Sequence, residues 1–274
     1  MKILCESYGS LENTQSSYLP KALASLGVGV ALRGADTSLY SVMDEFNPDY
    51  YMVHIYRMEQ ALVQYVNDED TPNIKLLLDC TGATDDHVSQ LESVLKDQGL
   101  SEHVEFLYSP ERIISTFKTV HIPECGDLEL VGVESINFNH KIEICNVGDL
   151  RPTGSGLDAT SWHNVAISEK PVEGYDYALP IAKLTPLLKN YERVYIHTKR
   201  KNIPQLVYDA FLSGCEVLLS ADDQQAIDNL CYEMLGTKLR RHKDQSDISR
   251  RIKEKHTPQH RAKTFLSQLK GIDL

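Results

Sequence analysis

The sequence predicts an α/β chain of two domains, each a parallel sheet with helices wound over both faces. Short apolar runs alternate with segments of helical periodicity along the chain, which is typical of βαβ units with right-handed crossovers. The chain has 274 residues, of which 42% are hydrophobic, and such a chain is able to build two modest cores. The alternation falls into two groups, and we expect one domain over 1–135 and another over 136–274.

The first half contains six predicted strands and four predicted helices. Leu19, Leu23 and Leu26 have the i, i+4, i+7 spacing of a helix that packs on a sheet, and Gly27 ends that helix. The predicted strands are Lys2–Glu6, Val28–Arg33, Tyr50–Ile55, Ile74–Asp79, Val104–Tyr108 and Lys118–Ile122. The predicted helices are Ser17–Leu26, Ser38–Phe46, Met58–Val66 and Asp85–Lys96.

The second half repeats the alternation. A last helix is expected after Thr257, because threonine is a good N-cap and Pro258 suits the first helical position. The stretch 148–163 is either an active-site loop or a plain connection. The predicted strands are Lys141–Val147, Asn164–Ser168, Arg193–His197 and Glu216–Ser220, and the predicted helices are Leu179–Leu188, Pro204–Leu212 and Asp222–Met234.

Two segments in the second half carry a resemblance to a known group of enzymes. Residues 203–219 form a predicted helix with Asp209, then Gly214 and an apolar strand, an order that resembles the donor-site motif of nucleotide-sugar glycosyltransferases of the GT-B fold. The segment 255–263, Lys-His-Thr-Pro-Gln-His-Arg-Ala-Lys, resembles the closing segment of CgeB-like glycosyltransferases. The resemblance implies two Rossmann-like domains facing each other across a cleft. The first would bind the acceptor, and the second, with its closing C-terminal helix, the nucleotide-sugar donor.

The resemblance also implies roles for residues of the donor-site helix. Asp209 would bind the donor ribose, where the family usually places Glu. Many relatives carry an arginine for the pyrophosphate at the position of Leu206, so the positive charge has to come from elsewhere in this chain.

Three consecutive cations precede the donor-site helix. A helix N-terminus favours anions through its dipole and its free N–H groups, so cations at this place indicate a diphosphate site. A solvated basic turn is the alternative interpretation. The residues that we expect to bind the donor here are Thr198, Lys199, Arg200 and Lys201.

Candidate catalytic residues end the strands of the first domain, where ligands of doubly wound sheets bind. Asp79 ends the fourth predicted strand, and by resemblance to inverting GT-B enzymes it would be the general base that deprotonates the acceptor hydroxyl. His54, at the end of the third strand, is the rival base. Either residue has a structural alternative, a helix cap for Asp79 and a hydrogen-bonded edge histidine for His54. The loop Tyr8, Gly9 and Ser10 after the first strand is a candidate acceptor or ligand loop.

The charge is divided unevenly between the halves. Residues 1–150 hold 9 Lys+Arg and 24 Asp+Glu, whereas residues 151–274 hold 19 and 15, so the second half is the half expected to meet phosphates. Residues 238–263 hold 10 Lys+Arg and 3 Asp+Glu, which indicates either contact with an acidic acceptor such as DNA or a solvated helix face. With a looser likeness to phage DNA β-glucosyltransferase, this makes a hydroxymethylated base in phage DNA the leading acceptor hypothesis. The acidic first half of the chain favours instead a polysaccharide, a protein or a small metabolite as the acceptor.

The expected donor substrate is a nucleotide diphosphate sugar, a UDP-sugar first among them, and no metal or other cofactor is required. His256 and His260 have the spacing of a zinc pair but lack a third ligand. Asp68-Glu69-Asp70 has the form of the metal-binding DxD motif, but it precedes a predicted strand instead of ending one, so no metal site is expected there either. The six cysteines form no CxxC pair and are expected to be buried thiols. Neither a signal-peptide core nor a membrane-spanning run is recognisable, so a cytoplasmic location is expected, that of the host cell if the protein is viral.

Two other function classes stay open at this point. A nucleotide-dependent oxidoreductase or epimerase would also begin with a Rossmann-like domain, but the first strand is followed by Glu-Ser-Tyr-Gly-Ser and no GxGxxG. A catalytically inert GT-B-like module that binds nucleotide or DNA is the non-enzymatic alternative.

Overall fold

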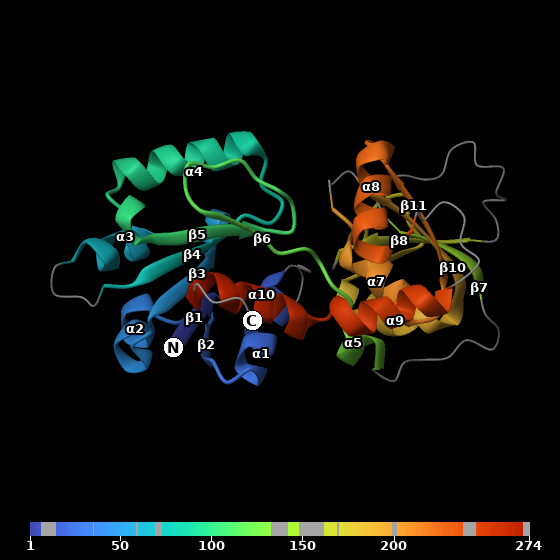
Figure 1. The fold of residues 1–274 in the computed structure, drawn as a ribbon, viewed down its shortest axis with the longest axis horizontal. Helices are drawn as coiled ribbons and strands as arrows, with labels where there is room; N and C mark the ends of the chain where they lie inside the picture. Colours follow the sequence, from blue (N-terminus) through green and yellow to red (C-terminus); the bar gives the residue numbers. More distant parts are fainter. Residues whose placement is uncertain are drawn as a thin grey trace. The chain divides into compact units, whose positions relative to one another are not determined.

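The chain divides into two compact units, each with its own parallel sheet (Figure 1). The computed structural model describes residues 1–6, 15–34, 36–58, 60–68, 73–132, 142–147, 162–168, 170–198, 202–237 and 245–270. Among the described residues, the first unit contains those up to Pro123 together with the C-terminal segment from Gln259, and the second unit contains those from Glu124 to Pro258.

The sheet of the first unit has six parallel strands in the order β2-β1-β3-β4-β5-β6. The strands are β1 (Lys2–Glu6), β2 (Gly29–Arg33), β3 (Tyr50–His54), β4 (Lys75–Asp79), β5 (Val104–Ser109) and β6 (Thr119–His121). The helices are α1 (Gln15–Ser25), α2 (Leu39–Phe46), α3 (Gln60–Asn67), α4 (Asp85–Asp97) and α10 (Pro258–Lys270), with 3-10 turns η1 (Ile55–Arg57) and η2 (Ser101–His103).

Both faces of this sheet are buried, as is usual for parallel sheets. In β5 the side chain of Leu107 joins the core beneath α4, whereas Phe106 and Tyr108 point to the opposite face. There the fully buried ring of Phe265 from α10 packs edge-on against both, with ring centroids 5.2 Å apart in each pair. The last helix of the chain therefore completes the core of the first unit.

The sheet of the second unit has five parallel strands in the order β11-β10-β7-β8-β9. The strands are β7 (Ile142–Val147), β8 (Trp162–Ile167), β9 (Tyr177–Leu179), β10 (Tyr191–Thr198) and β11 (Glu216–Ala221). The helices are α5 (Leu128–Gly132), α6 (Ile181–Leu187), α7 (Gln205–Leu212), α8 (Gln224–Leu235) and α9 (Gln245–Lys255), with the 3-10 turn η4 (Leu188–Asn190).

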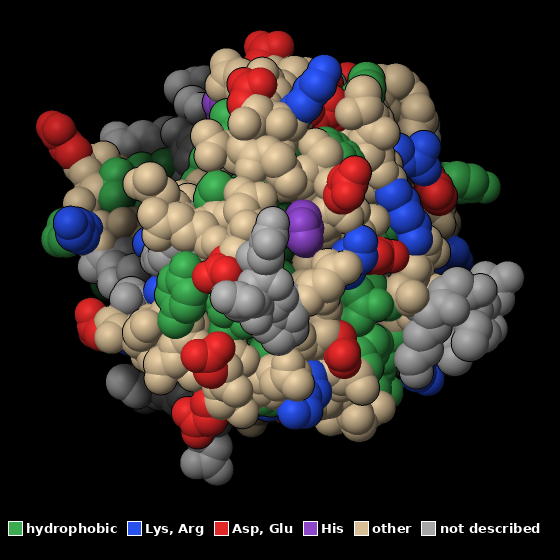
Figure 2. Space-filling model, turned by 90° about the vertical axis from the view of Figure 1, so that its left-hand side faces the viewer, with side chains coloured by type: hydrophobic (Ala, Val, Ile, Leu, Met, Phe, Trp, Pro, Cys, Tyr) green, Lys and Arg blue, Asp and Glu red, His purple; other side chains and the backbone are tan. Residues whose placement is uncertain are grey.

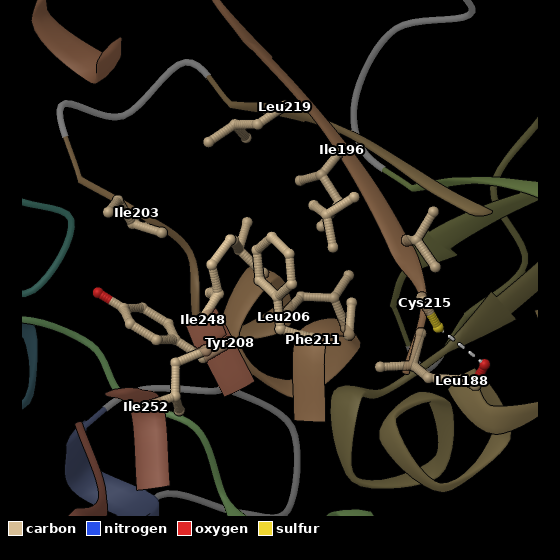
Figure 3. Close-up of a cluster of buried hydrophobic side chains, with 14 of the residues drawn as sticks. Leu188, Ile196, Ile203, Leu206, Tyr208, Phe211, Cys215, Leu219, Ile248 and Ile252 are labelled. Carbon is tan, nitrogen blue, oxygen red and sulfur yellow. Dashed lines mark hydrogen bonds between the residues drawn. The ribbon is translucent and has the colours of Figure 1, made fainter. Parts of the chain in front are cut away.

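Helix α7 lies at the centre of the second core (Figure 3). Leu206 and Phe211 of this helix pack with Ile196 of β10 and with Ile248 of α9 in one buried apolar cluster. Nearly every residue of α7 is buried, because strands cover one side of the helix and other helices the rest. An almost wholly apolar helix of this kind is a core element and not a surface helix.

The expected architecture of two doubly wound parallel sheets is thus present, but two local expectations differ from the structure. The predicted helix from Leu179 begins later, because Leu179 ends β9 and Pro180 is the N-cap of α6. A residue before proline is held extended, which explains the difference. Helices α5 and α9 and the three-residue strand β9 were not anticipated, since their patterns are short or strongly polar. The N-cap expected at Thr257 precedes a helix that begins at Pro258, as predicted.

The division of the chain also differs from the expected boundary at residue 135. The contacts divide the chain after Pro123, and α10, expected to belong to the second domain, packs with the first. The physical reason is that the face of β5 with Phe106 and Tyr108 needs an apolar cover, which α10 supplies from far along the chain.

The surface of the first unit that Figure 2 shows carries acidic and basic side chains interspersed with apolar and uncharged ones. Among the described residues, no helix combines the length and the apolar character needed to cross a bilayer. Among the described side chains, five cysteines are buried thiols outside any disulfide: Cys5, Cys80, Cys125, Cys215 and Cys231.

The variant Phe265→Ala is expected to destabilise the first unit by about 3–5 kcal/mol, because it removes a fully buried aromatic ring. Chemical denaturation followed by circular dichroism measures the change. Lys263→Ala, exposed on the same helix, is the control and should alter stability by less than about 0.5 kcal/mol. Equal effects of the two variants would show that α10 does not pack on β5 in solution.

Gly126→Ala is expected to destabilise the second unit by about 1–3 kcal/mol through overpacking. An added Cβ would lie 2.6 Å from Leu212 Cδ1 and 3.2 Å from Tyr208 Cβ. Gly132→Ala is the matched control, because a Cβ there meets nothing within 4 Å among the described residues. Thermal denaturation of both variants compares them, and a Gly126→Ala protein as stable as the control would contradict the packing.

Candidate functional site

The carboxyl ends of the strands are the places to look for a site in each unit, because loops converge there in parallel α/β sheets. In the first unit, His54 and Asp79 end β3 and β4 and stand opposite each other in register. The sequence-predicted base candidates are therefore brought together at one edge. The candidate loop Tyr8, Gly9 and Ser10 lies outside the described residues.

Asp79 is fully buried and is engaged by its own loop. Its Oδ1 accepts hydrogen bonds from the backbone N–H of Thr81, at 2.9 Å, and from the Thr81 hydroxyl, at 2.5 Å. This is the Asx-type turn by which an aspartate orders the chain after a strand. Thr84, and not Asp79, caps the following helix α4. In this conformation the Asp79 carboxylate has no surface to offer an acceptor hydroxyl, and its role as base stays a prediction.

The hydrogen bonds of His54 define its tautomer. Its Nδ1 accepts from the backbone N–H of Tyr56 at 3.3 Å, so Nδ1 carries no proton. Nε2 must then carry the proton of the neutral ring, and it donates to the carbonyl oxygen of Thr81 at 3.0 Å. Both ring nitrogens are thus used within the unit, and the role of His54 as a base also stays a prediction.

A buried ion pair occupies the neighbouring strand ends. Arg33, at the end of β2, donates from its guanidinium to Glu6 Oε1, at the end of β1, over 2.6 Å, and the hydroxyl of Tyr51 also bonds to Glu6. All three side chains are buried, so the group ties β1, β2 and β3 together. Such a pair is a structural element whose partners satisfy each other.

Two residues that sequence reasoning missed also lie at this edge. Tyr56, in η1 after β3, and His87, in the first turn of α4 after β4, bond through the tyrosine hydroxyl and His87 Nδ1 at 2.7 Å. Both side chains are exposed. The available signal was their position, a few residues beyond the ends of adjacent strands.

In the second unit, β10 and β11 carry a polar cluster at their carboxyl ends. His197 and Ser220 are opposite each other in register, and His197 Nδ1 lies 2.9 Å from Ser220 Oγ. The same hydroxyl is 2.7 Å from the hydroxyl of Tyr195. His197 Nε2 lies 3.3 Å from Asp222 Oδ1, so a protonated His197 would be held by a carboxylate. The sequence had marked His197 only as a strand end.

The N-terminus of α7 lies beside this cluster in the chain. Thr198 ends β10 and is almost fully buried. Asn202 and Gln205, at 2% and 5% exposure, each have a side-chain oxygen that finds no hydrogen-bond partner among the described residues. Buried oxygens without partners are rare and mark places where a further donor is expected. The three predicted phosphate-binding cations, Lys199, Arg200 and Lys201, lie outside the described residues.

Asp209 is placed in the interior of the second unit, not at its edge. Its carboxylate is fully buried and accepts from the backbone N–H of Asp127 at 2.8 Å, the hydroxyl of Thr185 at 3.0 Å and Gln205 Nε2 at 3.2 Å. It therefore joins the segment before α5 to helices α6 and α7. Leu206, where relatives carry an arginine, is also fully buried, in the apolar cluster of Figure 3.

Several solved structures resemble this chain over nearly its whole length. The crystal structure of the glycotransferase of kitacinnamycin matches with a TM-score of 0.53 and 11% identity, covering 97% of this chain and 98% of that one. The Streptomyces sp. SF2575 glycosyltransferase SsfS6 gives 0.46 and 12%, covering 97% and 99%. A Listeria monocytogenes protein described as a UDP-N-acetylglucosamine 2-epimerase gives 0.45 and 12%, covering 99% and 97%. No protein-family model and no curated protein matches the sequence.

The chain has a GT-B glycosyltransferase-like fold. At 11% identity the likeness shows the fold alone, so the chemistry has to come from the residues themselves. In this GT-B chain the predicted ribose ligand Asp209 has a packing role, because its oxygens are taken by three internal donors. Among the described residues, no group of three or more His, Cys, Asp or Glu side chains is arranged to hold a metal ion.

Burial raises the pKa of Asp209 from an ordinary 3.8 to about 7, although its three hydrogen bonds partly oppose the shift. Between these values the folded state keeps a proton that the unfolded chain has lost. The stabilising effect of that proton is complete below the unfolded pKa and is lost as the pH rises through the folded pKa.

The stability of the second unit is therefore expected to fall by roughly 3–5 kcal/mol between about pH 4 and pH 7 because of this group. In Asp209→Asn, which keeps an oxygen for the Asp127 N–H, this fall should be absent. Urea denaturation at several pH values measures both proteins, with the exposed Asp86→Asn as control. Parallel pH profiles of wild type and Asp209→Asn would contradict the assignment.

Proposed function

We propose that this protein is a glycosyltransferase that moves a sugar from a nucleotide diphosphate sugar, a UDP-sugar in the first instance, to an acceptor hydroxyl. The single observation that carries this proposal is the group of polar residues at the carboxyl edge of the sheet in the second unit. There the ends of β10 and β11 and the start of α7 carry His197, Thr198, Asn202 and Gln205, which flank the basic segment 199–201 in the sequence. The GT-B fold supports the same function.

The leaving group of such a transfer is a nucleoside diphosphate, whose negative charge increases as the glycosidic bond breaks. Fixed cations and helix N–H groups stabilise that charge. Here α7 begins after Pro204 with no side-chain cap, so its first N–H groups are not taken by one. Lys199, Arg200 and Lys201 would bind the diphosphate together with these groups, and His197, held between Ser220 and Asp222, would add charge when protonated.

The ribose of the donor needs other partners than Asp209, because the Asp209 carboxylate already accepts three internal hydrogen bonds. Asn202 and Gln205 each have an oxygen in need of a donor, and a ribose hydroxyl is such a donor. We assign ribose or base recognition to this pair.

The acceptor is proposed only as a molecule with a nucleophilic hydroxyl. The hydroxymethylated-DNA hypothesis rested on the basic tail and on the looser phage likeness. In the described part of the tail, Arg250 Nη2 lies 2.9 Å from Asp247 Oδ1 and Arg250 Nη1 lies 3.9 Å from Glu254 Oε1. Arg251 donates to the carbonyl oxygen of Met234 at 3.0 Å. Because internal partners occupy these arginines, polysaccharide, protein and small-metabolite acceptors have priority over DNA.

UDP is expected to raise the melting temperature of the wild-type protein, and at a concentration of 100 Kd the stabilisation should be about 2.7 kcal/mol. Replacing Lys199, Arg200 and Lys201 together by alanine should remove most of it, because the diphosphate loses its counter-charges. Replacing Lys253 and Lys255 of α9, exposed cations in the same unit, is the matched control.

Release of UDP from UDP-glucose then tests turnover in the same samples. No shift with UDP or GDP would refute the glycosyltransferase function. A shift with NAD alone would refute it too and would favour an oxidoreductase. Binding of UDP without turnover on any acceptor would instead indicate an inert nucleotide-binding module.

A further inference from the structure

The exposed pair Tyr56 and His87 in the first unit has a geometry that its packing does not require. The rings meet edge-on, with centroids 5.7 Å apart and an interplanar angle of 84°. Tyr56 is 58% exposed, and its ring also stands 5.2 Å from that of His54. An aromatic side chain left open between two imidazoles, at the edge where ligands of such sheets bind, is a surface suited to recognition.

The hydrogen bonds of His87 determine what the pair presents to a ligand. His87 completes a capping box with Thr84: its backbone N–H donates to Thr84 Oγ1, and its Nδ1 accepts from the Thr84 N–H, both at 3.3 Å. A backbone N–H only donates, so Nδ1 is unprotonated and the neutral ring carries its proton on Nε2. The Tyr56 hydroxyl, 2.7 Å from the same Nδ1, must then be the donor in that bond.

The pair consequently offers a defined pattern of one donor, one acceptor and one ring face. His87 Nε2–H is a donor, the phenolic oxygen of Tyr56 keeps its lone pairs as acceptors, and neither has a further partner among the described residues. A sugar hydroxyl is both donor and acceptor, and the C–H face of a pyranose packs on aromatic rings. This combination matches a saccharide better than a phosphate, which would have no use for the acceptor.

The neighbouring residues do not compete for this pattern. Asp79 and Thr81 bond to each other in the interior, and His54 uses Nε2 on the Thr81 carbonyl. These buried hydrogen bonds fix the chain between the ends of β3 and β4 and the elements that follow them, η1 and α4. Preorganised donors and acceptors of this kind give specificity at low entropic cost.

We propose that Tyr56 and His87 form a saccharide-binding subsite that receives a hydroxyl-rich acceptor. This rests on the proposed function, in which the second unit holds the donor. Tyr56 and His87 are assigned here to recognition of the acceptor, with no covalent step.

Binding of cellobiose and maltose to the full chain, followed by saturation-transfer NMR and calorimetry, tests the subsite. At least one disaccharide should bind the wild type. Tyr56→Phe should weaken this binding about three- to tenfold, the value of one hydrogen bond, and Tyr56→Ala should abolish it. His87→Glu should also weaken it, because glutamate at this position preserves the capping box but carries no N–H to replace the Nε2–H donor of histidine.

Tyr232→Phe is the matched control, since Tyr232 is 65% exposed on α8 of the second unit and should not affect the binding. Failure of both disaccharides to bind the wild type, or equal binding to wild type and Tyr56→Ala, would overturn the subsite. The thermal shift with UDP, measured on the same proteins, reads the donor site separately. A missing UDP shift with intact disaccharide binding would refute the proposed donor and leave the saccharide subsite standing.

Discussion

Parallel pairing of all the described strands is the constraint on which the rest of this structure depends. Parallel strands require a crossover after each strand, so both faces of each sheet are covered and all strand ends converge on one edge. In the first unit this brings His54, Asp79, Tyr56 and His87 together from two loops. In the second it gathers His197, Ser220 and the start of α7. The candidate functional residues therefore lie at two sheet edges, while the faces of the sheets pack against helices.

Helix α7 shows how packing overrules a local motif. Its sequence carries the order of a donor-site helix, yet seven of its eight residues are buried and Leu206 joins the core where relatives place a phosphate-binding arginine. Asp209 on the same helix links the segment before α5 to α6 through two hydrogen bonds. A carboxyl group removed from water in this way resists ionisation, so it is poorly suited to a charged contact with a ligand, whereas its hydrogen bonds fix the helix. The proposed donor site therefore assigns ligand contacts to Asn202 and Gln205, just before and at the start of the helix.

The edge of the first unit divides its polar residues into two groups. Glu6 with Arg33, and Asp79 with Thr81, are buried and satisfied by each other, so they hold the loops in shape. Tyr56 and His87 are exposed on top of this frame and have defined donor and acceptor atoms. Residues of the buried group were conspicuous in the sequence because they end strands. Residues of the exposed group were not, because their partnership joins two loops separated by 31 positions.

The sequence alone determined the fold class and most of the elements. Hydrophobic periodicity is local, so β1 was predicted residue for residue, and β10, α7 and β11 within a few residues. Predicted carboxylates and histidines were also found at strand ends, as the alternation requires. Only the tertiary structure decided which of them are buried, that α10 returns to cover β5, and that Tyr56 meets His87. These facts depend on contacts between distant segments, and the free energy of burial that governs them is a property of the assembled core and not of any local stretch of chain.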